Sequence, residues 1–262
     1  MNYFDKEERI IKLFQEEINR SRIMLYQKSL KNLRILNSIR SNKKFEKWIN
    51  SSRKNDMPPD FYNKKFKIMM DIMRFDDHAF VDKNKNIINK HNQRESKVTN
   101  DLIKKNEVFK AAAKDGRLFI NPFRDEEGDK DHNYERYLNN FKRVVGNHLD
   151  KIDNYKKNHP GYKTLFFLFD ESTPYIKLIN CNPPKTMNDT FHGELHQWWS
   201  DYNMIEIIQN SNLDYVIWFT PYKFVNSFKK VKYPMAVIYD VKKIKNSKLI
   251  KYRIDDLTST DL

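Results

Sequence analysis

The sequence predicts an α/β protein, with a mixed, partly parallel sheet flanked by helices and a helical, basic N-terminal region. Residues 164–169, 215–219 and 235–239 are so uniformly apolar that they suit strands buried within a sheet. Before and between them, apolar residues recur every three or four positions, which is typical of amphipathic helices. Strands that alternate with such helices form sheets with right-handed crossovers.

The composition is that of a folded, basic chain. Of its 262 residues, 39% are hydrophobic and 14% aromatic, and aromatic residues are scarce in disordered chains. A chain of this length can bury a sizeable core. Because no repeat or clear linker divides it, we expect one continuous unit, in which a helical basic region (residues 1–56) packs on an α/β domain (residues 57–262).

The first quarter of the chain is predicted to be helical. Residues 4 to about 40 have apolar positions at spacings of three and four and contain no Gly or Pro. A short helix over residues 43–50 follows, and the two prolines within residues 55–59 favour an extended turn. Residues 68–75 are then an apolar run interrupted by one acid and one base, which indicates a buried strand.

The remaining elements follow from the same patterns. A polar loop is expected at residues 82–93, a helix at 96–113, a short strand at 118–120 and an acidic loop at 124–131. A well-patterned helix at residues 133–157 precedes the most apolar strand, 164–169. A helix at residues 194–210 and the strands 215–219 and 235–239 complete the predicted order.

The charge indicates a polyanionic partner. The formal net charge is +14, and neutralised phosphates release counterions, which drives binding to nucleic acid. Between residues 20 and 54 the basic residues face a single acid, Glu46. The residues expected to contact nucleic acid are Arg34, Arg40, Lys43, Lys44, Lys47 and Arg53. The alternative is a solvated basic surface that reflects the codon usage of an AT-rich genome.

We expect a cytoplasmic protein without membrane association. Cys181 is the single cysteine, so no internal disulfide can form. The first residues lack the apolar core of a signal peptide, and no uncharged run approaches 18 residues. The sequence leaves the oligomeric state open.

One segment carries a candidate catalytic pattern. Pro59 and Asp60 are followed, eleven residues after Asp60, by Asp71 inside the apolar run 68–75. A helix with a glutamate, then Pro-Asp, then an acid in a buried strand resembles the PD-(D/E)XK nuclease superfamily, whose members hold Mg²⁺ with such acids for phosphodiester hydrolysis. The resemblance covers residues 10–76. It implies that Asp60 and Asp71 bind Mg²⁺, a cation that prefers carboxylate oxygens.

The other catalytic positions follow less directly. The resemblance implies that Glu17, or its neighbour Glu16, is the helical glutamate that completes the metal shell or orients water. Met73 stands where the family has its lysine. Arg74 is the candidate replacement, although a flat strand would place it on the opposite face from Asp71. The structural alternative is a turn aspartate plus a strand aspartate paired with a nearby Lys or Arg.

Two further places could hold a ligand. Asp170 and Glu171 follow the most apolar strand, and ligands of open α/β sheets bind beyond the carboxyl ends of strands; a simple turn is the alternative. His192 and His196 are four residues apart, which on a helix would suit a zinc ion, or they merely begin a helix. Five glycines, none spaced to cradle a phosphate, exclude nucleotide-binding P-loops and classical dinucleotide folds.

These observations favour a divergent metal-dependent nuclease that hydrolyses phosphodiester bonds in DNA or RNA. The alternative is a non-catalytic nucleic-acid-binding or interaction protein of a mobile element, which would use the same basic helices without a metal. A third interpretation is a protein-binding module whose charge reflects codon usage. Only the nuclease interpretation requires the carboxylates of Asp60 and Asp71 to converge on one ion.

Overall fold

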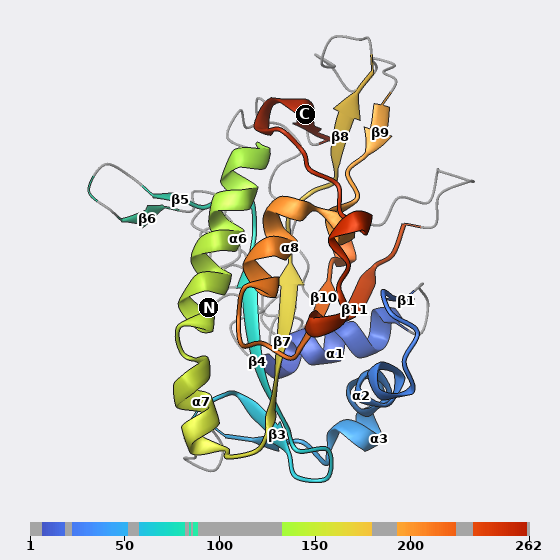
Figure 1. The fold of residues 1–262 in the computed structure, drawn as a ribbon, viewed down its shortest axis with the longest axis vertical. Coiled ribbons are helices and arrows are strands. Elements are labelled where there is room, and N and C mark those ends of the chain that lie inside the picture. Colours follow the sequence, from blue (N-terminus) through green and yellow to red (C-terminus); the bar gives the residue numbers. More distant parts are fainter. Residues whose placement is uncertain are drawn as a thin grey trace, which may run out of the picture.

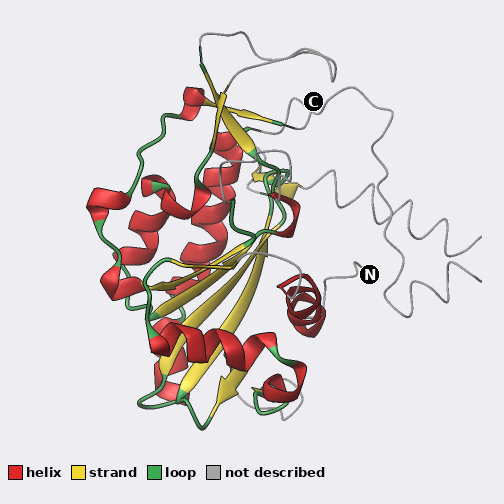
Figure 2. Cartoon of the chain, turned by 90° about the vertical axis from the view of Figure 1, so that its right-hand side faces the viewer, coloured by secondary structure: helices red, strands yellow, loops and turns green. Residues whose placement is uncertain are grey.

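The sheet lies between two layers of helices, as Figure 1 and Figure 2 show. The computed structural model describes residues 7–18, 23–51, 58–81, 84, 86–88, 133–179, 193–223 and 233–260. Within these residues the arrangement confirms the predicted α/β class with a mixed, partly parallel sheet.

The helices of the described residues fall before and after the gap at residues 89–132. The α-helices are α1 (Glu7–Ile18), α2 (Leu30–Arg40), α3 (Asn42–Phe45), α6 (Tyr134–Leu149), α7 (Ile152–Asn158) and α8 (Tyr202–Gln209). The 3-10 helices are η2 (Trp198–Ser200), η3 (Pro221–Lys223), η4 (Val241–Lys243), η5 (Asn246–Lys248) and η6 (Ile254–Asp256).

The main sheet has the order β1-β11-β10-β7-β4-β3-β2 among the described strands. Its strands are β1 (Ile23–Leu25), β2 (Ile49–Asn50), β3 (Phe61–Asn63), β4 (Ile68–Phe75), β7 (Lys163–Asp170), β10 (Tyr215–Phe219) and β11 (Ala236–Asp240). The central strands β4, β7 and β10 are parallel, whereas β2, β3 and β4 form an antiparallel meander. Two small sheets contain β5 (Phe80–Val81) with β6 (Ile87–Ile88), and β8 (Tyr175–Leu178) with β9 (Gly193–Leu195) and β12 (Leu257–Ser259).

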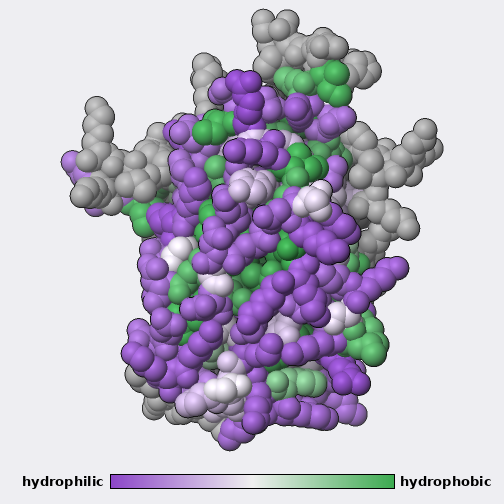
Figure 3. Space-filling view, in the orientation of Figure 1, coloured by the Kyte–Doolittle hydropathy of each residue, from purple (hydrophilic) through white to green (hydrophobic). Residues whose placement is uncertain are grey.

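Each face of the main sheet has its own apolar core. Alternate residues of β4 point to opposite faces: Met70 and Ile72 pack with α1 and α2, whereas Met69 and Met73 pack with α6, α7 and α8. This explains why β7 reads as a continuous apolar run, because both of its faces are covered. The outer surface on the side of α6 and α8 is mainly hydrophilic (Figure 3).

The helix predicted at residues 133–157 divides into α6 and α7, and the short helix predicted at residues 43–50 ends at Phe45, before β2. Strands break two further predicted helices. The helix expected over residues 4–40 is divided by β1, which pairs with the edge of β11, and Ser29 caps the new helix α2 by accepting a hydrogen bond from the backbone of Lys31. Residues 194–210 form the end of β9, then η2 and α8, where the side chain of Asp201 caps α8. In both places a capping side chain and sheet pairing interrupt a helical pattern.

The N-terminal region also contributes strands to the main sheet. β1 and β2 lie at its two edges, so the region is helical only in part. The helix, strand and loop predicted at residues 96–113, 118–120 and 124–131 lie outside the described residues. No helix within the described residues is both long and apolar enough to span a bilayer.

Candidate functional site

The structure brings Asp60 and Asp71 together. Asp71 lies in the middle of β4 on the face covered by α6 and α7, and it is 4% exposed. Asp60 directly precedes β3, and because Phe61 pairs with Met70, Asp60 comes opposite Asp71. The backbone N–H of Ile72 donates to Asp60 Oδ2 at 2.8 Å. We call Asp60 and Asp71 the carboxylate pair.

The two acids share a hydrogen bond, which requires a proton on one of them. Burial and then the negative charge of Asp71 raise the pKa of Asp60 to about 8, although the bond from Ile72 acts in the opposite direction. Asp60 is therefore mainly protonated at neutral pH. A buried acid held against another acid is a group that a cation would stabilise in its charged form.

Two side chains fix the orientation of Asp71. His148 Nδ1 lies 2.5 Å from Asp71 Oδ2, and the hydroxyl of Tyr155 donates to the same oxygen at 2.9 Å. His148 is in the last turn of α6 and its side chain is 25% exposed, whereas Tyr155 is a buried residue of α7. Burial and the charge of Asp71 raise the pKa of Tyr155, so its hydroxyl stays protonated and donates.

Glu17 does not join the carboxylate pair, contrary to the prediction. The α1 acid whose charge acts on Asp60 is Glu7, at the first position of the helix. Glu17 lies ten residues further along, about 15 Å away at the rise of an α-helix. Glu16 makes an exposed ion pair with Lys12 at 3.9 Å. The helix therefore approaches the site with its N-terminus and not with its C-terminal half.

Arg74 also lies away from the pair. Its guanidinium forms an ion pair with Glu171, the residue after β7. Because side chains alternate along β4, Arg74 lies on the opposite face of the sheet from Asp71. Met73, at the position of the family's lysine, is buried in the core. Lys67 is an exposed turn residue with φ 47° just before β4. Among the described residues, His148 is therefore the basic side chain that contacts Asp71.

The ligand set at the pair is small. Within the described ranges, no group of three or more His, Cys, Asp or Glu residues is arranged to hold a metal ion. Two adjacent carboxylates nevertheless suit Mg²⁺, which is commonly held by one or two carboxylates while water and substrate phosphates complete its shell. The donor chemistry of Asp60 and Asp71 thus fits this cation.

A groove of about 1030 Å³ opens between α1, α3 and β2, on the face of the sheet that α1 and α2 cover. Neither Asp60 nor Asp71 lines it, and Asp71 points to the other face of the sheet. The wall of the groove includes Phe61, Asn50 and Glu8, which are chain neighbours of Asp60, Ser51 and Glu7. The full lining is Glu8, Ile11, Lys12, Gln15, Glu16, Arg40, Ser41, Asn42, Phe45, Glu46, Trp48, Ile49, Asn50 and Phe61.

One of the predicted nucleic-acid contacts lines this groove, and three others are exposed on or just after α3, which borders it. The first is Arg40, and the three others are Lys43, Lys44 and Lys47. These four residues and Arg34 of α2 make no ion pair with any described residue, so their charge is not compensated within that part of the chain. Arg53 lies outside the described residues.

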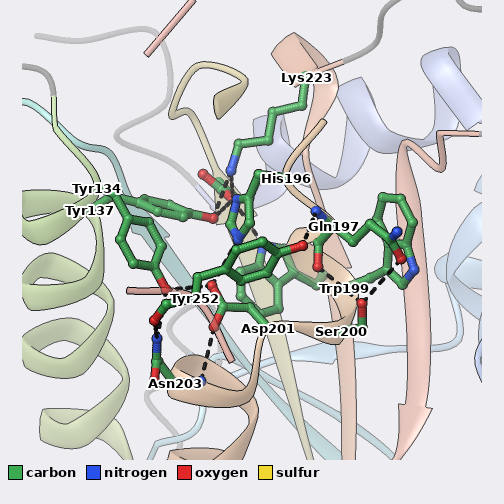
Figure 4. Close-up of polar contacts among 12 residues, drawn as sticks. Tyr134, Tyr137, His196, Gln197, Trp199, Ser200, Asp201, Asn203, Lys223 and Tyr252 are labelled. Atoms are coloured by element: carbon green, nitrogen blue, oxygen red, sulfur yellow. Dashed lines mark hydrogen bonds and ion pairs between the residues drawn. The ribbon is translucent and has the colours of Figure 1, made fainter. Parts of the chain in front are cut away.

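A second polar cluster lies at the carboxyl end of β7, around Asp170. Figure 4 shows two of its members, Tyr137 and Lys223. Asp170 Oδ2 accepts from Lys223 Nζ at 2.9 Å and from the Tyr137 hydroxyl at 2.6 Å, and Trp218 Nε1 donates to it at 3.0 Å. Ser172 donates its backbone N–H and its hydroxyl to Oδ1. Asp170 is 0% exposed and Lys223 1% exposed. We call these residues the Asp170 cluster.

Next to this cluster, His196 and Asp201 form another buried pair. His196 Nε2 lies 2.8 Å from Asp201 Oδ2, and the hydroxyl of Tyr134 donates to that oxygen at 2.6 Å. Burial lowers the pKa of His196 despite the opposing effect of Asp201. His196 precedes η2 and is not on an α-helix, and His192 lies outside the described residues, so the helical spacing argued for a zinc site does not hold.

Sequence reasoning missed the two side chains that contact Asp71 of the carboxylate pair. His148 and Tyr155 stand in the apolar stripe of the predicted 133–157 helix, at the spacing of three and four that continues Phe141, Val145 and Ile152. Histidine and tyrosine in such a stripe, facing a strand that carries one acid, were the available signal for these contacts.

Comparison with protein-family models, curated proteins and solved structures finds no match to the chain.

Proposed function

We propose that the protein is a metal-dependent phosphodiesterase that hydrolyses nucleic acid, with Asp60 and Asp71 as its Mg²⁺ ligands. The convergence of these two carboxyl groups in a largely buried place supports the proposal most strongly. Their mutual repulsion is relieved if a divalent cation replaces the shared proton. We also propose a cytoplasmic location, where Cys181 stays reduced and nucleic acid is accessible.

The residues around the pair have distinct roles in this proposal. His148 and Tyr155 hold Asp71 in place, as hydrogen-bonding partners behind a metal ligand do. Asp60 gives up its proton when the cation binds. The uncompensated basic residues at the groove attract the phosphate backbone. When bound, Mg²⁺ would polarise the phosphate and promote formation of the attacking hydroxide.

The decisive experiment is cleavage of plasmid, single-stranded DNA and RNA with Mg²⁺ or Mn²⁺, compared between wild type and Asp60→Asn. Because loss of a partner behind a metal ligand alone costs about 10- to 100-fold, loss of the ligand should reduce the rate at least about 100-fold. Asp255→Asn, an exposed acid of η6, is the matched control and should cleave at the wild-type rate.

Asp60→Asn suits this test because the amide is neutral and its oxygen can still accept from the backbone N–H of Ile72, and a thermal melt shows whether the variant is folded. Asp71→Asn provides a second variant, and its thermal melt shows whether it is folded. Cleavage that persists unchanged in both folded variants, or no cleavage of any substrate by wild type, would overturn the proposal.

A non-catalytic nucleic-acid-binding protein is the second candidate. It is favoured by the buried Met73 at the lysine position and by the two-carboxylate ligand set within the described residues. This candidate predicts salt-sensitive binding that survives loss of both Asp60 and Asp71, with no cleavage.

A further inference from the structure

The groove between α1, α3 and β2 has an aromatic wall. The ring of Phe45 stacks on Trp48 with centroids 6.3 Å apart and contacts Phe61 at 5.3 Å. Phe45 is only half-buried, so part of its ring faces the groove that it lines. A partly exposed ring held by two other aromatic residues is a rigid surface on which a base can stack.

Polar side chains with free hydrogen-bonding capacity stand around this wall. Arg40 and Asn42 line the groove, and neither side chain has a hydrogen-bond or ion-pair partner among the described residues. Arginine binds phosphate with its guanidinium fork, and asparagine can donate to and accept from a base edge.

The charge balance of the groove also suits a nucleic acid. Of its three acids, Glu8 accepts a hydrogen bond from Asn50 at 2.8 Å, and Glu16 is paired with Lys12. The exposed residues Lys43, Lys44 and Lys47 add uncompensated positive charge along α3. The lining alone holds three acids (Glu8, Glu16 and Glu46) and two bases (Lys12 and Arg40), and the three exposed lysines beside it turn the balance of the region positive, with five bases against three acids.

We propose that this groove binds single-stranded nucleic acid, with a base stacked on Phe45 and the adjacent phosphate held by Arg40. In a duplex the bases are stacked on one another and their faces cannot reach an aromatic wall, whereas an unpaired base can. The inference deepens the proposed function by naming the substrate class. It rests on that function only for the step in which the bound strand is cleaved at the carboxylate pair, which lies outside the groove.

The test measures binding without catalysis. Fluorescence anisotropy of labelled single-stranded DNA and RNA 12-mers, and of the matching duplexes, is recorded with the full chain in a chelator at fixed salt. We expect single strands to bind at least about tenfold more tightly than duplexes, since base stacking contributes about 1 to 3 kcal/mol per base.

Two variants locate the binding. Phe45→Leu keeps an apolar side chain but removes the ring, and Arg40→Gln removes the charge; each should weaken single-strand binding about tenfold. Arg253→Gln, an exposed arginine beside η6, is the matched control and should bind within about twofold of wild type. Equal affinity for duplex and single strand, or wild-type binding by both groove variants, would overturn the inference.

Hydrolysis of bis(p-nitrophenyl) phosphate separates this inference from the proposed function, because so small a diester does not need the groove. Hydrolysis of it by wild type and by the control Arg253→Gln, together with loss of single-strand binding by the groove variants, supports the inference. If the small diester is hydrolysed but single strands show no preference, the groove inference fails and the catalytic proposal stands. If single strands are preferred but no diester is hydrolysed, the catalytic proposal fails and the groove inference stands.

Discussion

The same helix, α6, serves two buried carboxylates that are compensated in opposite ways. Near its first turn, Tyr137 donates to Asp170, and in its last turn His148 contacts Asp71. Asp170 receives five hydrogen bonds, one of them from the buried Lys223. Asp71 instead has two partners on one oxygen and a second acid, Asp60, beside it.

This difference separates a structural acid from a candidate functional one. A carboxylate saturated by internal donors and by a lysine has no electrostatic need for a ligand. Two acids forced together have such a need, because only a proton or an external cation relieves their repulsion. Ligands of α/β sheets often bind at the carboxyl ends of the strands, so location alone would have favoured Asp170, at the end of β7, as the functional acid. The partners of each acid favour the carboxylate pair.

The strongest test of the comparison is Asp170→Asn. It leaves Lys223 charged and fully buried without its counter-ion, so we expect the free energy of unfolding to fall by about 3 to 5 kcal/mol in urea titrations. The double variant Asp170→Asn/Lys223→Met removes both charges and should recover most of that loss. A single variant within about 1 kcal/mol of wild type would show that the ion pair is not the compensation we describe.

Asp60→Asn should change stability in the opposite direction. The raised pKa of Asp60 means that folding takes up a proton between about pH 3.9, where the unfolded group titrates, and about pH 8. Stability is therefore full below pH 3.9 and is lost as the pH rises toward 8. Asparagine lacks this titration. Since one pKa unit is worth about 1.4 kcal/mol and the gap is about four units, we expect the variant to be more stable by up to about 5 kcal/mol at pH 8.

Urea titrations of wild type and Asp60→Asn at pH 4 and pH 8 measure this effect. The two proteins should be nearly equal at pH 4 and clearly different at pH 8. Asp255→Asn, at an exposed position, should show no such pH dependence. A variant that is less stable than wild type at pH 8 would mean that Asp60 is ionised and compensated in the folded protein.

Added Mg²⁺ or Mn²⁺ should stabilise wild type at pH 8. A ligand at 100 times its Kd raises the free energy of unfolding by about 2.7 kcal/mol when it binds only the folded state. At pH 7, where Asp60 holds its proton, calorimetry in buffers of different ionisation enthalpy should also detect proton release on binding. Neither cation should stabilise Asp60→Asn. Equal stabilisation of both proteins would place the cation elsewhere.

The fold could be predicted further than the site, and particular residues show why. β7, β10 and β11 carry uniform apolar runs, and β4 carries an apolar run interrupted by one acid and one base, so the positions of these strands follow from local sequence. β1 could not be found, because Ile23–Leu25 continues a helical pattern and becomes a strand only by pairing with β11. Edge pairing over more than 200 residues leaves no local signal.

In the site, Asp60 and Asp71 were predicted because Pro59-Asp60, followed by an acid in an apolar run, resembles the pattern of a nuclease superfamily. Glu17 and Arg74 were predicted from their positions along a single helix and a single strand. In the structure, the α1 acid whose charge acts on Asp60 is Glu7, at the other end of the helix, and Arg74 pairs with Glu171. His148 and Tyr155 come from helices more than 70 residues away. Such partners depend on how α6 and α7 lie across the sheet, which periodicity does not determine.

The smallest effects compare two tyrosines that each donate to one of the acids. Tyr155→Phe removes one hydroxyl bond to Asp71, so we expect a loss of about 1 kcal/mol, the usual contribution of one hydrogen bond. Tyr137→Phe removes the bond to Asp170 and also the acceptor for Lys223 Nζ at 2.7 Å, so its loss should be about twice as large. Both variants keep the ring, so urea titrations report the hydroxyl alone. A larger loss of unfolding free energy for Tyr155→Phe than for Tyr137→Phe would contradict the comparison. It would mean that the carboxylate pair depends on its internal hydrogen-bond donors at least as much as the Asp170 cluster does.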